Sequence, residues 1–222
     1  MRTWLAALLL LLTLPARAQT PEEADAASAA LSAQLSAGLR VTWTGQGLSC
    51  GPILLTGLSN GSGAPLTVRL VPGMVLTPSD DGQRMMLASR HEVALQAGQE
   101  ASVMPEGYCL DPSKDPPPRG QAVNYSLGSG FAADLTLIRV GERLAAEGRF
   151  GPEFPPDQRK VVVIQRAIWA SRGYTRQDLA VEIADEFAAR TDPNRAGSVS
   201  PEALADSIWR DVELVLREAG QR

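Results

Sequence analysis

Between residues 39 and 110 the apolar side chains occur in short runs, each bounded by a turn signal, and this pattern constrains the fold more than any other. Runs such as Leu66-Thr67-Val68-Arg69-Leu70 alternate apolar and polar side chains, and dipeptides such as Pro72-Gly73 separate the runs. Alternation with a period of two indicates strands, and turn signals every 8 to 12 residues, roughly, are typical of antiparallel sandwiches and barrels. The sequence therefore predicts an antiparallel β-sandwich or open barrel at 39–110.

The apolar spacing becomes helical beyond a Pro-rich segment at 111–130, which we expect to be an extended surface crossover or a strip that docks a peptide. The prolines of this segment exclude a helix or a sheet interior. Downstream, apolar residues recur at helical spacing, and Thr175 and Ser200 begin segments with helix-capping patterns. The region 131–222 is therefore predicted to be a four-helix half, which makes the chain an α+β protein.

The first residues of the chain have the layout of a secretory signal peptide. Arg2 precedes an almost unbroken apolar run that ends at Leu14, and Ala16 and Ala18 are the small residues that a signal peptidase reads. The run is shorter than the roughly 20 apolar residues that a membrane span needs. We expect cleavage after residue 18, no transmembrane segment in the mature chain, and a secreted or periplasmic protein.

An Ala-rich segment at 19–38 opens the mature chain. It begins with Thr20-Pro21-Glu22-Glu23, a capping pattern with Pro at the first helical position. Because Leu31 and Leu35 are its only larger apolar side chains, a helix here would bury little apolar area. The segment is predicted to be either a lead helix or a mobile segment.

Composition excludes several classes of function. The formal net charge of −4 argues against a phosphate-backbone binder, and 5% aromatic residues provide little surface for stacking bases. A single His excludes metal sites built from several His residues. We therefore expect no nucleic-acid partner and no cofactor.

The two cysteines of the chain, Cys50 and Cys109, bracket the predicted β region. In an oxidising compartment two cysteines in one exported chain most simply form a disulfide bond. Closing a loop of this length would stabilise the fold by roughly 4 kcal/mol in the chain-entropy model. The sequence therefore predicts a Cys50–Cys109 disulfide joining the first and last strands.

A second interpretation of Cys109 comes from a resemblance. Tyr108-Cys109 and Gln165-x-Ala167-x-Trp169 resemble the two halves of the thioester motif of bacterial surface adhesins, although an Ile precedes the Gln where that family has Thr. In that family the Cys and the Gln form a thioester with loss of ammonia, and an amine or hydroxyl on a host protein opens it. The resemblance implies a Cys109–Gln165 thioester, which excludes the disulfide. The alternative is a core helix with Gln165 hydrogen-bonded at its edge.

The segment that begins at Asp192 has part of a calcium-binding pattern. Asp192, Asn194 and Ser200 occupy positions that an EF-hand loop favours, but Ala196 and Ala203 stand where that loop needs oxygen ligands. The pattern therefore predicts at most a weak calcium site, and a turn followed by a helix cap explains the same residues.

No assembled catalytic constellation is recognisable in the sequence. His91 is followed by Glu92 in a predicted strand, but no nucleophile is placed beside it by spacing. We therefore expect a non-enzymatic exported protein that interacts with an unknown protein or envelope component. A covalent adhesin and a weak calcium-binding module are the alternatives.

Overall fold

The strands predicted between residues 39 and 110 are present in the computed structural model, which describes residues 20–128, 131–189 and 200–221. They are joined by two strands from the Pro-rich segment and preceded and followed by helices, so the predicted α+β class is confirmed. The strands are β1 (Leu39–Gly45), β2 (Cys50–Pro52), β3 (Leu54–Asn60), β4 (Leu66–Leu70), β5 (Val75–Pro78), β6 (Met85–Leu87), β7 (His91–Leu95), β8 (Glu100–Val103), β9 (Glu106–Cys109), β10 (Ala122–Val123) and β11 (Tyr125–Gly128).

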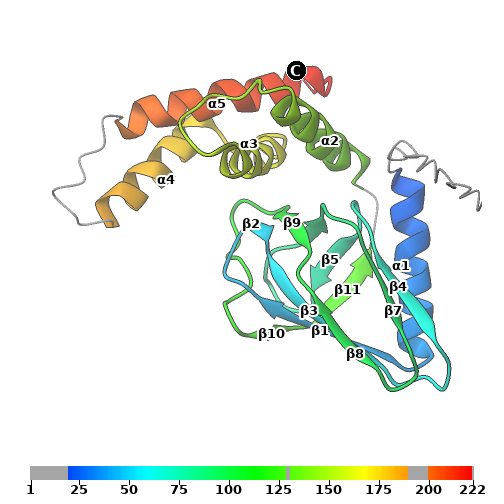
Figure 1. The fold of residues 1–222 in the computed structure, drawn as a ribbon. Coiled ribbons are helices and arrows are strands. Elements are labelled where there is room, and N and C mark those ends of the chain that lie inside the picture. Colours follow the sequence, from blue (N-terminus) through cyan, green and yellow to red (C-terminus); the bar gives the residue numbers. More distant parts are fainter. Residues whose placement is uncertain (1–19, 129–130, 190–199, 222) are drawn as a thin grey trace, which may run out of the picture.

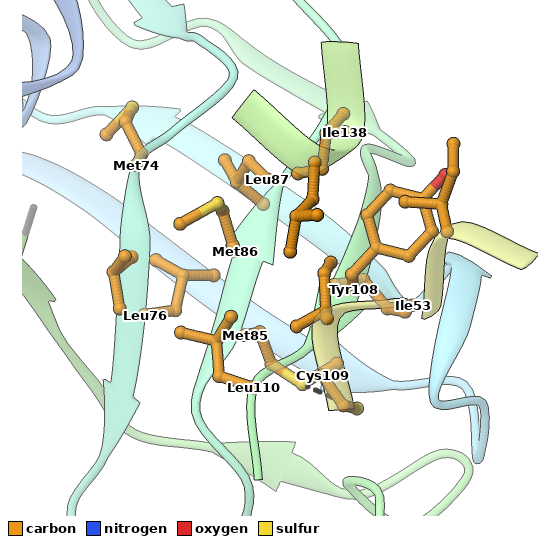
Figure 2. Packing of buried hydrophobic residues seen from close by; sticks show 14 of the residues in the cluster. Ile53, Met74, Leu76, Met85, Met86, Leu87, Tyr108, Cys109, Leu110 and Ile138 are labelled. Carbon is orange, nitrogen blue, oxygen red and sulfur yellow. Dashed lines mark hydrogen bonds between the residues drawn. The ribbon is translucent and has the colours of Figure 1, made fainter. Parts of the chain in front are cut away.

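The strands form three antiparallel sheets, with the orders β10-β1-β3-β8, β11-β5-β6-β9-β2 and β4-β7. β1 and β3 are paired along their whole length, from Leu39 opposite Asn60 to Gly45 opposite Leu54. In β3 the burial alternates, so that Leu54 and Leu58 face the core while Leu55 faces outward, as the period of a strand requires. The sheets surround a core in which Met85, Met86, Leu87 and Leu110 pack together (Figure 2).

Helix α1 (Pro21–Ser36) is docked on the β region, so of the two alternatives for this segment, a lead helix and a mobile segment, the structure has the helix. The Thr20 hydroxyl accepts a hydrogen bond from the Glu23 N–H at 3.3 Å, which caps the first turn. Ala24 and Leu31 are buried, and the Ser28 hydroxyl donates to the Gly128 carbonyl at 3.2 Å. The helix lies along β4, at the side of the β region (Figure 1).

In the described part of the chain, four helices follow the β region, and they lie together over one end of it (Figure 1). They are α2 (Ala132–Ala146), α3 (Pro156–Ala170), α4 (Arg176–Ala189) and α5 (Pro201–Glu218). The caps predicted at Thr175 and Ser200 are present: the Thr175 hydroxyl accepts from the Asp178 N–H at 3.2 Å, and the Ser200 hydroxyl accepts from the Ala203 N–H at 3.2 Å. These local signals therefore set where α4 and α5 begin.

Phe131 marks the junction between the β region and the helices. The Arg84 guanidinium lies 5.3 Å from the centre of the Phe131 ring, and that of Arg172 lies 5.8 Å from it. Arg84 forms a forked ion pair with Asp111, at the end of β9, and Arg172 forms one with Asp134 of α2. Each guanidinium is therefore held in place by a carboxylate, and the two fix Phe131 where the two halves meet.

Candidate functional site

The structure brings Cys109 and Gln165 into direct contact, across 56 positions of the chain. The Cys109 N–H donates to Gln165 Oε1 at 2.9 Å, and Gln165 Nε2 donates to the Cys109 carbonyl at 2.8 Å. Gln165 thus pairs with the end of β9 much as a neighbouring strand would. Both residues have no exposed surface, so these hydrogen bonds form in the core.

Trp169, one turn further along α3, completes this arrangement. Its Nε1 donates to the same Cys109 carbonyl at 3.0 Å. Cys109, Gln165 and Trp169 are called the Cys109 clamp below. Gln165 and Trp169 lie on one face of α3 because they are four positions apart. The clamp therefore attaches α3 to β9, in the sheet with the order β11-β5-β6-β9-β2.

An aromatic and charged cluster covers the outer side of the clamp. The Arg166 guanidinium lies 4.6 Å from the centre of the Trp169 ring and 5.7 Å from that of Tyr174. Arg166 pairs with Glu182 of α4, which also accepts a hydrogen bond from the Tyr174 hydroxyl at 2.6 Å. These contacts link α3 to α4 above the buried amide of Gln165.

The thiol of Cys109 points away from the clamp and into the β core. Its Sγ lies 3.2 Å from Met85 Sδ, and Figure 2 shows the side chain among those of Met85 and Leu110. Burial raises the pKa of the Cys109 thiol well above its ordinary value, and a hydrogen bond with Ser49 opposes this only in part. The thiol therefore stays protonated at neutral pH, in contrast to the thiolate of a reactive cysteine.

The predicted Cys50–Cys109 disulfide is wrong, because both cysteines are free thiols. Cys50 stands opposite Tyr108 in the β2–β9 pairing, so it is one position out of register with Cys109. Successive side chains of a strand point to opposite faces of the sheet. Cys50 and Cys109 therefore belong to opposite faces, even though they lie on neighbouring strands.

His91 has a neighbour that the spacing of the sequence did not reveal. Its Nε2 is hydrogen-bonded to the Ser89 hydroxyl at 3.0 Å, and the same oxygen accepts from the Glu106 N–H at 2.8 Å. Glu92 pairs instead with the exposed Arg69. Ser89 and His91 thereby attach the loop before β7 to the start of β9.

Most of the predicted calcium loop lies outside the described residues. Asp192, Asn194 and Ala196 fall there, so the prediction of a weak site stays a prediction. Ser200, its remaining oxygen ligand, caps α5. Within the part of the chain that is described, no three His, Cys, Asp or Glu side chains come together in a way that would hold a metal ion.

A groove of about 330 Å³ was not predicted as a site in its own right. It lies between the Pro-rich segment and the turn that connects β5 to β6, and its lining includes Asp80, Asp115, Pro117 and Tyr125. In the sequence the signal for this groove is the run of prolines, which is typical of either a surface crossover or a strip that docks a peptide. The groove is therefore a candidate site in addition to the Cys109 clamp.

Comparison of the chain with protein families, with curated proteins and with solved structures finds no match. Among the described residues, no helix has both the length and the apolar character that crossing a membrane requires.

Proposed function

We propose that this protein is an exported, non-enzymatic interaction module whose β and helical halves act as one unit. The Cys109 clamp carries this proposal. The resemblance places Gln165 in a thioester, but the Gln165 carboxamide and the Trp169 indole are both hydrogen-bonded to the main chain of Cys109. Groups that are buried and already hydrogen-bonded to the main chain stabilise the fold, and such groups are not free to bind a substrate.

The remaining support comes from the junction and from the surface. The Arg84 guanidinium of the β region contacts the Phe131 ring, and the Cys109 clamp joins β9 to α3, so the loops of the β region have a fixed frame from which to contact a partner. On α4 the apolar side chain of Val181 is 52% exposed. The partner that we propose is a protein or another component of the cell envelope.

Export follows from the signal-peptide pattern at 1–18, which lies outside the described residues. The test is expression of the full chain in a bacterial host, cell fractionation and sequencing of the mature N-terminus. We expect the purified extracytoplasmic protein to begin at Gln19, and Leu9→Arg to keep the chain in the cytoplasm at full length. Wild-type chain that stays uncleaved in the cytoplasm contradicts this proposal.

Interaction is tested by photo-crosslinking in living cells. A photoreactive residue is placed at Arg119 in the Pro-rich segment, at Val181 on α4, and at the exposed Asp157 as a control. We expect a discrete adduct from Arg119 or Val181 and none from Asp157. Adducts from neither position would speak against an interaction module.

The non-enzymatic part is tested by turnover of ester, peptide and phosphate substrates. We expect no turnover above that of a heat-denatured sample. A turnover that Ser89→Ala and His91→Ala both abolish, in variants with an unchanged melting temperature, would make the protein an enzyme.

The second candidate is a covalent adhesin, and the contact between Cys109 and Gln165 favours it. To form the thioester, Cys109 Sγ attacks Gln165 Cδ, and the amide nitrogen leaves as ammonia with the thiol proton. An amine then attacks the same carbon, so that an amide forms, the C–S bond breaks, and Cys109 recovers its proton. Gln165 Oε1 accepts from the Cys109 N–H and Gln165 Nε2 donates to the Cys109 carbonyl, and these two hydrogen bonds favour the structural role instead.

Peptide mapping by mass spectrometry, without reduction, separates the two candidates. A thioester joins the Cys109 and Gln165 peptides with loss of one ammonia, and methylamine separates them. Mapping is required because an N-terminal Gln19 also loses ammonia when it cyclises. Separate peptides with an intact Gln165 in wild type, as in the control Cys109→Ser, would eliminate the adhesin.

A further inference from the structure

The groove beside the Pro-rich segment combines rigid apolar surface with an aromatic ring. Pro116, Pro117 and Pro118 line it, and proline has few backbone conformations to lose when a ligand binds. Tyr125 also lines the groove, and its ring packs edge-to-face on Trp43 with centres 6.2 Å apart. The ring is therefore held in place before any ligand arrives.

The charge of the groove is negative. Asp80, Asp81 and Asp115 line it, and Asp81 is paired with the Lys114 ammonium at 2.7 Å. Among the described residues, neither Asp80 nor Asp115 is in an ion pair; Asp80 Oδ1 accepts only the Gly82 N–H, at 3.1 Å. Two uncompensated carboxylates therefore remain, and they favour a cation.

An independent observation points to a ligand that donates hydrogen bonds. Gln83 lines the groove and is 2% exposed, and its Nε2 donates to the carbonyls of Asp111 and Lys114. Its Oε1 is buried and has no hydrogen-bond partner. A buried amide oxygen without a donor costs about 1–3 kcal/mol, so a donor from a ligand would remove this cost.

A divalent metal ion does not fit this arrangement, because no metal-binding group of acidic side chains is present within the described residues. An alkylammonium ion fits better. Its N–H groups match carboxylate and amide oxygens, while its methylene chain matches proline and tyrosine surfaces. We infer that the groove lined by Asp80, Asp115, Gln83 and Tyr125 binds a primary ammonium group on an aliphatic chain.

Two sources supply this chemistry: a free polyamine, or a lysine side chain on a partner. The inference goes beyond the proposed function, because amine binding to the purified protein is measured without reference to export or to any partner. Titration calorimetry at low salt uses spermidine as one probe and Nα-acetyl-lysine methylamide as the other. Binding of spermidine alone indicates a free polyamine, binding of the lysine probe alone indicates a partner's lysine, and binding of both indicates a site for the ammonium group itself.

Charge variants then tie the binding to the groove. We expect Asp80→Asn/Asp115→Asn to weaken binding about tenfold or more. The control Asp25→Asn/Asp185→Asn removes the same charge at exposed helix positions and should leave the affinity unchanged. Lys114→Gln should strengthen binding, because it frees Asp81 and removes a competing cation.

The opposite directions of these effects separate recognition from damage to the fold, because unfolding would weaken binding in every variant. The inference is overturned if wild type binds neither probe. It is also overturned if the groove variant and its control bind equally well.

Discussion

The Cys109 clamp makes a quantitative prediction about a carbonyl group that has two donors. The Cys109 carbonyl accepts from Gln165 Nε2 at 2.8 Å and from Trp169 Nε1 at 3.0 Å. Gln165→Leu removes the first donor and Trp169→Phe removes the second. In either single variant the carbonyl keeps one partner, and the Cys109 N–H keeps its bond to the Ser49 carbonyl at 2.8 Å.

The expected free energies of unfolding follow from this geometry. Gln165→Leu loses two hydrogen bonds, each worth about 1 kcal/mol net, and should lower stability by about 1–2 kcal/mol. Trp169→Phe loses one bond and some buried area, and should lower it by about 1–3 kcal/mol. The double variant leaves a buried carbonyl with no donor, which adds about 1–3 kcal/mol to the sum of the single effects.

The assay is urea unfolding of wild type, the two single variants and the double variant. Their free energies of unfolding are compared provided that the slope of free energy against urea concentration is the same for all four. A matched control combines Gln165→Leu with Trp43→Phe, a tryptophan of β1 that packs on Tyr125. The control pair should be additive to within about 0.5 kcal/mol. Additivity of the Gln165 and Trp169 pair to the same precision would refute the reasoning that both donors serve one carbonyl.

Three further predictions concern the thiols, the acid limb of stability and helix packing. Because Cys109 has no exposed surface, a thiol reagent should modify it only after unfolding. In denatured, unreduced protein the reagent should modify both cysteines, and a count of one free thiol or none in that sample would contradict this prediction. Burial by itself would raise the pKa of the Asp111 carboxyl, but the hydrogen bonds with Arg84 outweigh burial and lower this pKa. The ionised carboxylate therefore stabilises the fold above the unfolded pKa of about 4, and this stabilisation is lost as pH falls through the folded pKa. Asp111→Asn should therefore lose less stability than wild type between about pH 5 and pH 2, as followed by urea midpoints, and parallel curves would exclude this pair as the cause. Gly141→Ala should lower the free energy of unfolding by about 1–3 kcal/mol, because the new Cβ overlaps Ile164 Cγ1. Adding Ile164→Ala to the same chain should reduce that loss. An unchanged melting temperature in Gly141→Ala would instead show that α2 and α3 separate easily.

The elements of this protein were predictable where their signals are local. The alternation of apolar residues in β3 and β4, and the caps at Thr20, Thr175 and Ser200, each depend on residues within a few positions of one another. The α+β class follows from these periods alone. Docking of α1 was open in the sequence, because its narrow Ala-rich face indicated little buried area.

The pairing of the cysteines was not predictable in the same way. Whether Cys50 faces Cys109 depends on the register of β2 against β9, and a shift of one residue reverses the face of every side chain. The sequence pattern shows that both residues lie near strands, but it carries no information on which residue stands opposite which. The disulfide was therefore a sound expectation from compartment and number, and tertiary register overturned it.

By itself the sequence determined the class of the fold and where several helices begin. It also determined that Cys109 lies in the β region and Gln165 in the helical region. Only the tertiary structure decided that the Gln165 amide pairs with the main chain of Cys109 while the thiol turns toward Met85. It also decided that Asp80 and Asp115 line one groove with Gln83. Periodicity and capping arise from neighbours along the chain, whereas these contacts join segments far apart in the sequence, and their geometry is set by how the whole core packs.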